Sequence, residues 1–298
     1  MIDIPTERKN QEPLIRALRL EDQERCLALS TEAGWNQNEN DWRLLLRLCG
    51  GYGIDVPNYG LAGTTMAWEL EERNAWVNMV LVAKVYRGRG FARKLMTACL
   101  GDLASDQRLA MLDATDLGFS VYSKLGFSGE DRIARLYRES ETESVAPSSS
   151  SADGLLMKPM RSEDLGPVAN LDLRVVGIDR GKVLADFYRR EPEAAWVVRD
   201  VSGSLRGFVL GRDGRIATQI GPIVAETRMV AEALLTRALS QIAGPVIVDA
   251  PMVNTEWIEA LKRFGFAPQR EFLRMGINGT ALATDWSRTY AVSGPDLG

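Results

Sequence analysis

The sequence predicts a mixed α/β fold that occurs twice in tandem. Apolar runs typical of strands alternate with amphipathic runs typical of helices along the 298 residues. A serine-rich segment at 139–154 divides the chain into halves of similar length. A shift of 139 residues lays "ARKLMTACL" (92–100) over "AEALLTRAL" (231–239), and Gly126-Phe127 over Gly265-Phe266. Two anchors that agree on one offset indicate a repeated fold, with a central mixed sheet flanked by helices in each half.

In the first half, residues 18–34 carry apolar side chains three and four positions apart, which predicts a helix. Residues 60–72 and 75–85 are typical of two antiparallel strands around a turn near Arg73-Asn74. The remaining elements follow in order: an amphipathic helix at 91–104, a short buried strand at 108–115 and the start of another helix at 118–124.

The second half repeats this plan, with strands at 195–200, 204–214 and 215–225, a helix from about 228, a strand at 245–250 and a helix that ends near Phe264. Between the halves, 139–154 contains six serines, a proline and a glycine, but no Leu, Ile or Phe. Such a composition buries too little apolar surface to order itself, so it predicts a linker. We therefore expect an N-terminal domain at 1–138 and a C-terminal domain at 155–298.

Composition excludes several classes of function. The net charge of −4 argues against nucleic acid or an anionic membrane as a partner. The chain has no histidine, which excludes Ser–His–Asp and Cys–His catalysis. Three dispersed cysteines favour reduced thiols and make a poor metal cage, so no metal is expected. No apolar run approaches 18 residues and the first residues lack a signal-peptide core, which predicts a cytoplasmic location.

The stretch "KVYRGRGFARKL" (84–95) joins an apolar strand to a helix and predicts a pyrophosphate site. Its glycines permit positive φ and close approach of the backbone. The unpaired amides and the dipole of the helix start favour an anion, and three arginines add positive charge. A P-loop would need Gly-Lys-Ser/Thr, and a Rossmann turn would need a small residue where Arg93 stands. A glycine-rich turn with a solvated basic face stays the alternative.

This stretch resembles the signature of GCN5-related N-acetyltransferases (GNAT), Arg/Gln-x-x-Gly-x-Gly/Ala, here Arg87-x-x-Gly90-x-Ala92. Residues 112–127, "LDATDLGFSVYSKLGF", resemble the second signature of that family, which ends in Tyr-x-x-x-Gly-Phe. The tandem arrangement resembles a bacterial subset of double-domain members. The resemblance implies two acyl-CoA N-acyltransferase domains, the first of them catalytic.

The resemblance also implies acetyl-CoA as the acyl donor. The strand at 76–85 would hold its pantetheine arm, and amides from Arg89 to Arg93 would hold its pyrophosphate. The implied cofactor-binding residues are Met79, Val80, Leu81, Val82, Arg87, Gly88, Arg89, Gly90, Phe91, Ala92 and Arg93. An amine would attack the acetyl carbonyl directly, a tetrahedral intermediate would form, and the CoA thiolate would leave.

Tyr122 matches the general acid of the family, and a phenol with a pKa of about 10 can donate a proton at neutral pH. A tyrosine that packs on a helix with its hydroxyl in solvent is the alternative. Asp113 and Glu69 are candidates for the general base, acting through water. Asp113 could instead orient the substrate ammonium or cap the next helix, and Glu69 could be an exposed strand residue without such a role.

The second half has lost the residues that carry this chemistry. The 139-residue shift maps Arg87 to Glu226, Gly88 to Thr227, Gly90 to Met229 and Tyr122 to Leu261. We therefore expect the second domain not to bind acetyl-CoA in the usual way, and to shape the acceptor site instead. The candidate substrate-binding residues are Trp35, Asn36, Asp249 and Asn254. Arg274 could bind a substrate carboxylate or form a surface ion pair.

The sequence thus predicts an acetyl-CoA-dependent N-acetyltransferase that acts on a primary amine of a small molecule. An acetyl-CoA-binding sensor with little turnover is one alternative. A protein lysine acetyltransferase is another, and it would need an open groove. A homodimer is compatible with the sequence, which leaves the acceptor, the base, the oligomeric state and the pathway open.

Overall fold

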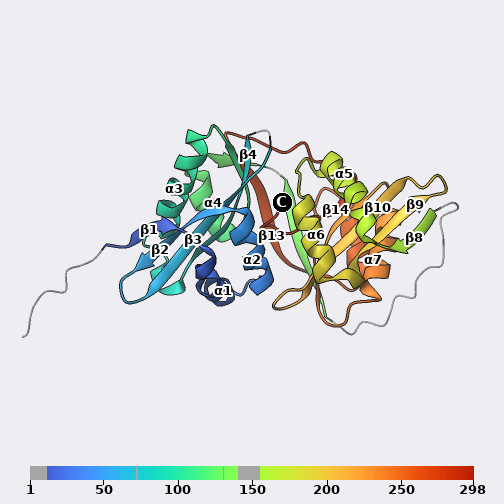
Figure 1. Ribbon diagram of the computed structural model, residues 1–298, viewed down its shortest axis with the longest axis horizontal. Coiled ribbons are helices and arrows are strands. Elements are labelled where there is room, and N and C mark those ends of the chain that lie inside the picture. Colours follow the sequence, from blue (N-terminus) through green and yellow to red (C-terminus); the bar gives the residue numbers. More distant parts are fainter. Residues whose placement is uncertain (1–11, 72, 130, 140–154) are drawn as a thin grey trace, which may run out of the picture.

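A computed structural model describes residues 12–71, 73–129, 131–139 and 155–298. It confirms the mixed α/β fold and two similar halves (Figure 1). The predicted linker lies almost wholly outside the described residues. The first half comprises β1 (Leu14–Ala17), α1 (Gln23–Glu32), α2 (Glu39–Leu48), β2 (Gly50–Val56), β3 (Gly60–Glu69), β4 (Asn74–Val82), α3 (Phe91–Ser105), β5 (Leu109–Ala114), α4 (Asp116–Ser123), β6 (Phe127–Ser128) and β7 (Arg132–Arg138).

The second half repeats this order. It comprises β8 (Leu155–Pro159), α5 (Leu165–Val176), α6 (Gly181–Arg190), β9 (Trp196–Asp200), β10 (Leu205–Arg212), β11 (Thr218–Ala225), α7 (Arg228–Leu239), β12 (Val246–Pro251), α8 (Thr255–Arg263), β13 (Ala267–Ile277) and β14 (Thr289–Ala291).

The helix α2 was not among the sequence predictions, although the sequence carries its start signal. The side chain of Asn38 accepts from the amides of Asn40 and Asp41, and the Asp41 carboxylate accepts from the Asn38 amide. This reciprocal capping box fixes the start of the helix. The predicted helix at 18–34 is shorter, because a 3₁₀ turn at Leu20–Asp22 precedes α1.

The two halves exchange strands within one continuous sheet. Its order is β1-β2-β3-β4-β5-β13-β7-β12-β11-β10-β9-β8, with β6 and β14 paired off this path. Strand β13 of the second half pairs antiparallel with β5 of the first, and β7 of the first pairs antiparallel with β12 of the second. Each half therefore completes the sheet of the other, which a sequence repeat alone does not reveal.

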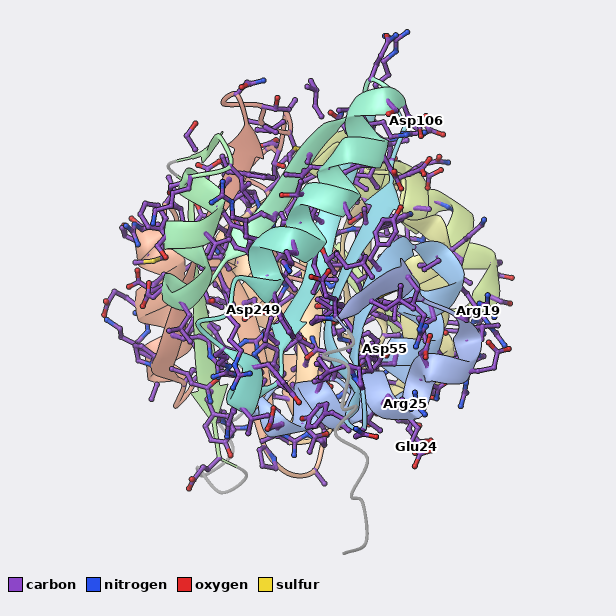
Figure 2. All side chains as sticks on the ribbon, turned by 90° about the vertical axis from the view of Figure 1, so that its left-hand side faces the viewer. Arg19, Glu24, Arg25, Asp55, Asp106 and Asp249 are labelled. Carbon is purple, nitrogen blue, oxygen red and sulfur yellow. The ribbon has the colours of Figure 1, made fainter. Side chains whose placement is uncertain are left out.

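The exchange places charged residues in direct register. Arg274 of β13 lies opposite Asp113 of β5, and Arg135 of β7 lies opposite Asp249 of β12. Both pairs form two-pronged ion pairs, at 2.9 Å for the first and 2.7 Å for the second. Asp249 is fully buried, whereas Arg19, Glu24 and Asp106 project outward from the first half (Figure 2). The strand exchange therefore carries buried charges that match only between halves.

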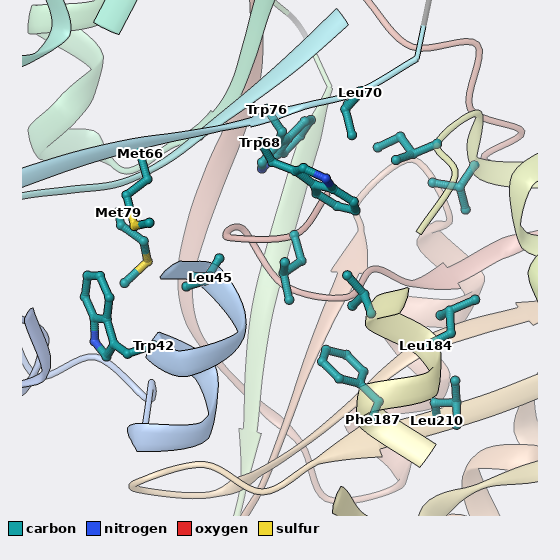
Figure 3. Close-up of a cluster of buried hydrophobic side chains, with 14 of the residues drawn as sticks. Trp42, Leu45, Met66, Trp68, Leu70, Trp76, Met79, Leu184, Phe187 and Leu210 are labelled. Carbon is teal, nitrogen blue, oxygen red and sulfur yellow. The ribbon is translucent and has the colours of Figure 1, made fainter. Parts of the chain in front are cut away.

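The halves also share a hydrophobic core. Trp42 and Leu45 of α2 belong to the same buried cluster as Trp76 of β4 and as Leu184 and Phe187 of α6 (Figure 3). The segment 292–298 continues from β14 into the space between the halves (Figure 1). Its Leu297 is fully buried in this cluster. Burial of several tryptophans across the junction holds the halves in one arrangement.

Candidate active site

A pocket opens where β4 and β5 separate. The two strands pair in parallel only from Asn74 opposite Leu109 to Trp76 opposite Met111. Beyond that point β4 bends, because Met79 adopts a left-handed φ of 49° and the register to β3 shifts. The hydroxyl of Thr64 donates to the Met79 carbonyl at 2.7 Å and fixes this bend. A left-handed conformation at a residue with a side chain is strained, and such strain is typical of functional sites.

Both halves contribute to the pocket wall. Strand β4 supplies residues 77–80, and β5 supplies Leu112 and Asp113. Thr115, which precedes α4, and Tyr122, near the end of that helix, also line the pocket. The loop before α2 supplies Trp35 and Gln37. The exchanged strands and the segment after β14 close the other side with Arg135, Arg270, Phe272, Pro295 and Asp296.

Tyr122 lies in α4 and faces this pocket. The side chain of Thr115 caps the helix by accepting from the Gly118 amide, and the ring of Tyr122 packs against Phe127 at 6.1 Å between centroids. No described residue forms a hydrogen bond with the Tyr122 hydroxyl. Burial raises the pKa of the phenol above its ordinary value. The phenol therefore keeps its proton at neutral pH and is free to donate it.

The start of α3 presents free backbone amides. Gly88 and Gly90 have left-handed φ values of 75° and 77°, and Gly90 leaves the helix without a side-chain cap. A Cβ atom at either glycine would meet no atom within 4 Å, so the space beside the turn is open. The exposed side chains of Arg87, Arg89 and Arg93 surround it. Free amides, the helix dipole and the arginines together suit an anion such as a diphosphate.

The equivalent helix of the second half is closed. The hydroxyl of Thr227 caps α7 by accepting from the Val230 amide, so its first turn has an internal partner. Glu226, which stands in the position of Arg87, forms an ion pair with Arg206 at 2.8 Å. These contacts replace the features that suit an anion at α3.

The gap between β11 and β12 is also filled. These strands pair in parallel only at residues 218–220 and then separate, as β4 and β5 do. Here β14 pairs with β11 in the gap, and the Val292 amide donates to the Asp249 carbonyl at 2.9 Å. A Cβ atom on Gly221 would lie 2.2 Å from the Val292 carbonyl oxygen, so only glycine allows this approach. A segment of the chain thus occupies the space that forms the pocket in the first half.

The two candidates for the general base lie in different surroundings. Asp113 lines the pocket, but Arg274 binds both of its carboxylate oxygens at 2.9 Å. Burial raises the pKa of Asp113 and Arg274 opposes this shift. Glu69 does not line the pocket, because it is exposed and paired with Arg108 at 2.9 Å. This position argues against Glu69 as the base, and a base role for Asp113 would require it to leave its ion pair.

Of the four candidate substrate-binding residues, only Trp35 lines the pocket. The side chain of Asn36 binds the backbone of residues 216 and 217, and so joins the halves. Asp249 is paired with Arg135 and accepts from Gln219 at 2.7 Å. Asn254 donates to the carbonyls of Trp286 and Thr289. These three side chains are held by other parts of the protein and do not line the pocket, which argues against their prediction as acceptor ligands.

The carboxylate Asp296 was missed because no local pattern marks it. It accepts two hydrogen bonds from Arg212, at 2.9 and 3.0 Å, and its backbone carbonyl accepts from the Asn78 side chain at 2.8 Å. Burial would raise its pKa, but Arg212 and Gln37 hold the pKa below the ordinary value. Asp296 therefore stays ionised and is paired with Arg212.

Comparison with known proteins identifies the fold. The model of the acetyltransferase (GNAT) family matches residues 16–127, and that of an acetyltransferase (GNAT) domain matches residues 168–291. The chain is a tandem GNAT protein. This confirms the resemblance seen in the two signature motifs, and it confirms that the second half, which lacks them, has the same fold. Proteins of the GNAT family are acyltransferases, and the family matches together with the curated relatives described next identify this chain as an acyltransferase.

Two curated relatives span most of the GNAT chain. An uncharacterized N-acetyltransferase of Bacillus subtilis, YitH, is 27% identical over 80% of this chain and 83% of its own. A holothin acyltransferase of a Pseudoalteromonas species is 26% identical over 90% of this chain and 85% of its own.

Solved structures share the tandem fold. A putative acetyltransferase from Pyrococcus horikoshii covers 99% of both chains with a TM-score of 0.76 and 21% identity. A tandem GNAT protein from the clavulanic acid biosynthesis pathway covers 91% of this chain and 99% of its own, with a TM-score of 0.66 and 16% identity. No helix among the described residues has the length and apolar character needed to cross a bilayer. Among the described residues, no group of three or more Cys, Asp or Glu side chains is arranged so that it could hold a metal ion.

Proposed function

We propose that this GNAT protein transfers an acetyl group from acetyl-CoA to the primary amine of a small molecule, in the pocket between β4 and β5. The observation that carries the proposal is Tyr122, which lines this pocket with a protonated and unpartnered hydroxyl. A donor of this kind suits a step in which a thiolate departs and needs a proton.

The residues present fit acetyl-CoA. The uncapped start of α3 and the open space beside Gly90 suit its diphosphate, with Arg87, Gly88, Arg89, Phe91, Ala92 and Arg93 around it. Residues Met79 to Val82, where β4 is released from β5, would hold the pantetheine arm. When bound, acetyl-CoA supplies the acyl group and the thiol leaving group.

The protein groups then act on protons and orientation. Tyr122 holds the proton for the leaving sulfur, and its burial beside Phe127 keeps water from competing for that proton. Asp113 holds Arg274 in place through their ion pair, and this role does not require Asp113 to gain or lose a proton.

The closed second half supports one catalytic site per chain. Its helix start is capped and its strand gap is filled by β14. The same chain segment then passes Pro295 and Asp296 to the wall of the first-half pocket. A pocket that is closed on this side favours a small acceptor over a lysine on a protein surface. We propose that the second half shapes the acceptor site and has no catalytic role.

The first test separates donor binding from folding. Arg93→Glu puts a carboxylate in the first turn of α3, where the helix dipole favours it, so the fold should be unaffected. We expect affinity for CoA to fall about 10-fold or more in calorimetric titration, because two charge units change beside a diphosphate. Arg228→Glu makes the same change at α7 and serves as the control, with unchanged affinity. Equal affinities in both variants would contradict the site at α3.

The second test separates an enzyme from a sensor. Release of CoA thiol is followed over a panel of small primary amines, with wild type and Tyr122→Phe. We expect amine-dependent release that falls about 10²-fold in kcat in the variant, with unchanged CoA affinity. Binding of acetyl-CoA without amine-dependent thiol release would favour a sensor.

A further inference from the structure

The wall of the pocket carries a positive charge without a partner. Both carboxylates that line the pocket are paired with an arginine, Asp113 with Arg274 and Asp296 with Arg212, which Asp41 shares. A third arginine of the wall, Arg135, is neutralised by Asp249. The side chain of the fourth, Arg270, forms no ion pair or hydrogen bond with any described residue. Among the charged side chains that line the pocket, Arg270 is therefore the one without an ion-pair partner among the described residues.

Arg270 stands beside a second available donor. It lies opposite Arg135 in the register of β13 and β7. Arg135 uses its Nε and Nη2 atoms for Asp249, and its Nη1 atom has no hydrogen-bond partner among the described residues. Partial burial lowers the pKa of Arg270 and so does the nearby charge of Arg135, while Asp249 opposes this shift. Two guanidinium groups in direct register repel each other. An anion between them would relieve this repulsion, and a carboxylate fits the planar fork of a guanidinium.

The pocket also holds two buried oxygen atoms that lack donors. Oε1 of Gln37 and Oδ1 of Asn78 have no hydrogen-bond partner, and both side chains are at least nine-tenths buried. The amide nitrogen of Asn78 is held by the Asp296 carbonyl at 2.8 Å, so its oxygen is turned to a fixed side. Buried acceptors are normally paired, and the N–H groups of an amine would pair these two.

We propose that the acceptor is an amine that also bears a carboxylate, with its nitrogen at Gln37 and Asn78 and its carboxylate at Arg270 and Arg135. This inference rests on the proposed acetyl transfer and names its substrate class. It assigns specificity to β13, so the second half selects the acceptor through the strand that it inserts into the sheet of the first.

The test compares acceptors that differ only in the carboxylate. Thiol release from acetyl-CoA is measured with the common amino acids, β-alanine and 4-aminobutyrate, each beside its carboxamide and its decarboxylated amine. We expect kcat/KM for the carboxylate form to exceed that of both analogues by about 10-fold or more, the scale of a charge-assisted pair. Equal or better use of the neutral analogues would overturn the proposal.

A variant then ties this preference to Arg270. Arg270→Gln should raise KM for the carboxylate acceptor about 10-fold to 100-fold, with affinity for CoA unchanged and the preference over the carboxamide lost. Arg263→Gln, an exposed arginine at the end of α8, is the matched control and should change nothing. A preference that survives Arg270→Gln would contradict the assignment.

A binding readout keeps this inference separate from the proposed function. The Tm of the CoA-loaded protein is measured with the same sets of compounds. Loss of CoA binding itself would contradict the proposed function. The carboxylate site alone would be overturned if the protein binds CoA but no carboxylate-bearing amine raises its Tm or is acetylated by it.

Discussion

The direction in which Tyr122 points depends on a missing side chain one helical turn earlier. Gly118 precedes it by four positions on α4, so the two residues share a face of the helix. A Cβ atom on Gly118 would lie 2.5 Å from Cε2 of the tyrosine ring and 3.2 Å from its hydroxyl. The ring therefore occupies space that only glycine leaves free.

Gly118→Ala should displace the ring and lower kcat by about 10-fold to 100-fold, since small misplacements of a catalytic group are costly. Affinity for CoA should not change. Gly101→Ala in α3 is the matched control, because a Cβ atom there meets nothing within 4 Å, and alanine should stabilise this helix by about 0.5–1 kcal/mol. Steady-state kinetics and CoA titration measure the difference. Full activity of Gly118→Ala would show that the ring is not constrained from this side.

The pH profile should reflect the raised pKa of Tyr122. A group whose pKa is raised keeps its proton to higher pH, so the acid form persists through the alkaline range. We expect kcat to stay level from neutral pH to about pH 10, the ordinary pKa of tyrosine. The kcat/KM for the acceptor should rise from neutral toward alkaline pH, because a primary amine with a pKa of about 10 is largely protonated at neutral pH and only its free base attacks. An alkaline loss below pH 9 that is absent in Tyr122→Phe would argue against this environment.

The signature motifs in the sequence pointed to Tyr122 and to the glycine-rich turn at Gly88 and Gly90, because a fixed spacing encodes a local arrangement. Arg270 and Gln37 carry no such pattern. Whether an arginine is paired or free depends on which strand lies beside it, and here that strand comes from the other half. Asp249 and Asn254 were misread for the same reason, since their partners lie on segments far away along the chain or in loops.

At the scale of elements, α3 and α7 show that loss of an anion site has two parts. The first part is local: Gly88 and Gly90 give way to Thr227 and Met229, and the helix start becomes capped. The second part is not local, because β14 fills the gap beside β11. Sequence comparison revealed the first part and not the second, since β14 is too short to be recognised from its pattern.

Restoring the glycines should therefore not restore the site. The double variant Thr227→Gly and Met229→Gly frees the first turn of α7, yet the pairing of β14 with β11 remains. We expect calorimetric titration to give one CoA per chain, as in the wild type. Two CoA molecules per chain would mean that β14 does not prevent CoA binding in the second half, and that the capped start of α7 alone prevents it in the wild type.

At the scale of the whole molecule, the two halves form one continuous structure despite the repeat. The sheet is continuous through β5, β13, β7 and β12. A buried polar chain also crosses the junction, from Asp41 through Arg212 to Asp296 at the pocket. The sequence predicted the two halves correctly as similar folds. It could not predict their exchange of strands, because the hydrophobic pattern of a strand sets its faces and leaves its neighbour undetermined.

Separation of the halves tests this exchange. A first chain that ends at Glu139 and a second that begins at Leu155 would each lack the strand inserted by the other. Asp113 and Asp249 would then be buried without their arginines, and breaking a buried ion pair costs about 3–5 kcal/mol, against a total stability of about 5–15 kcal/mol. We expect either half alone to be unfolded or aggregated by circular dichroism and sedimentation, and the two co-expressed halves to form a stable one-to-one complex that binds CoA. A folded, monomeric first half that binds CoA would show that β7 can take the place of β13 beside β5, and that the exchange is not needed for the fold.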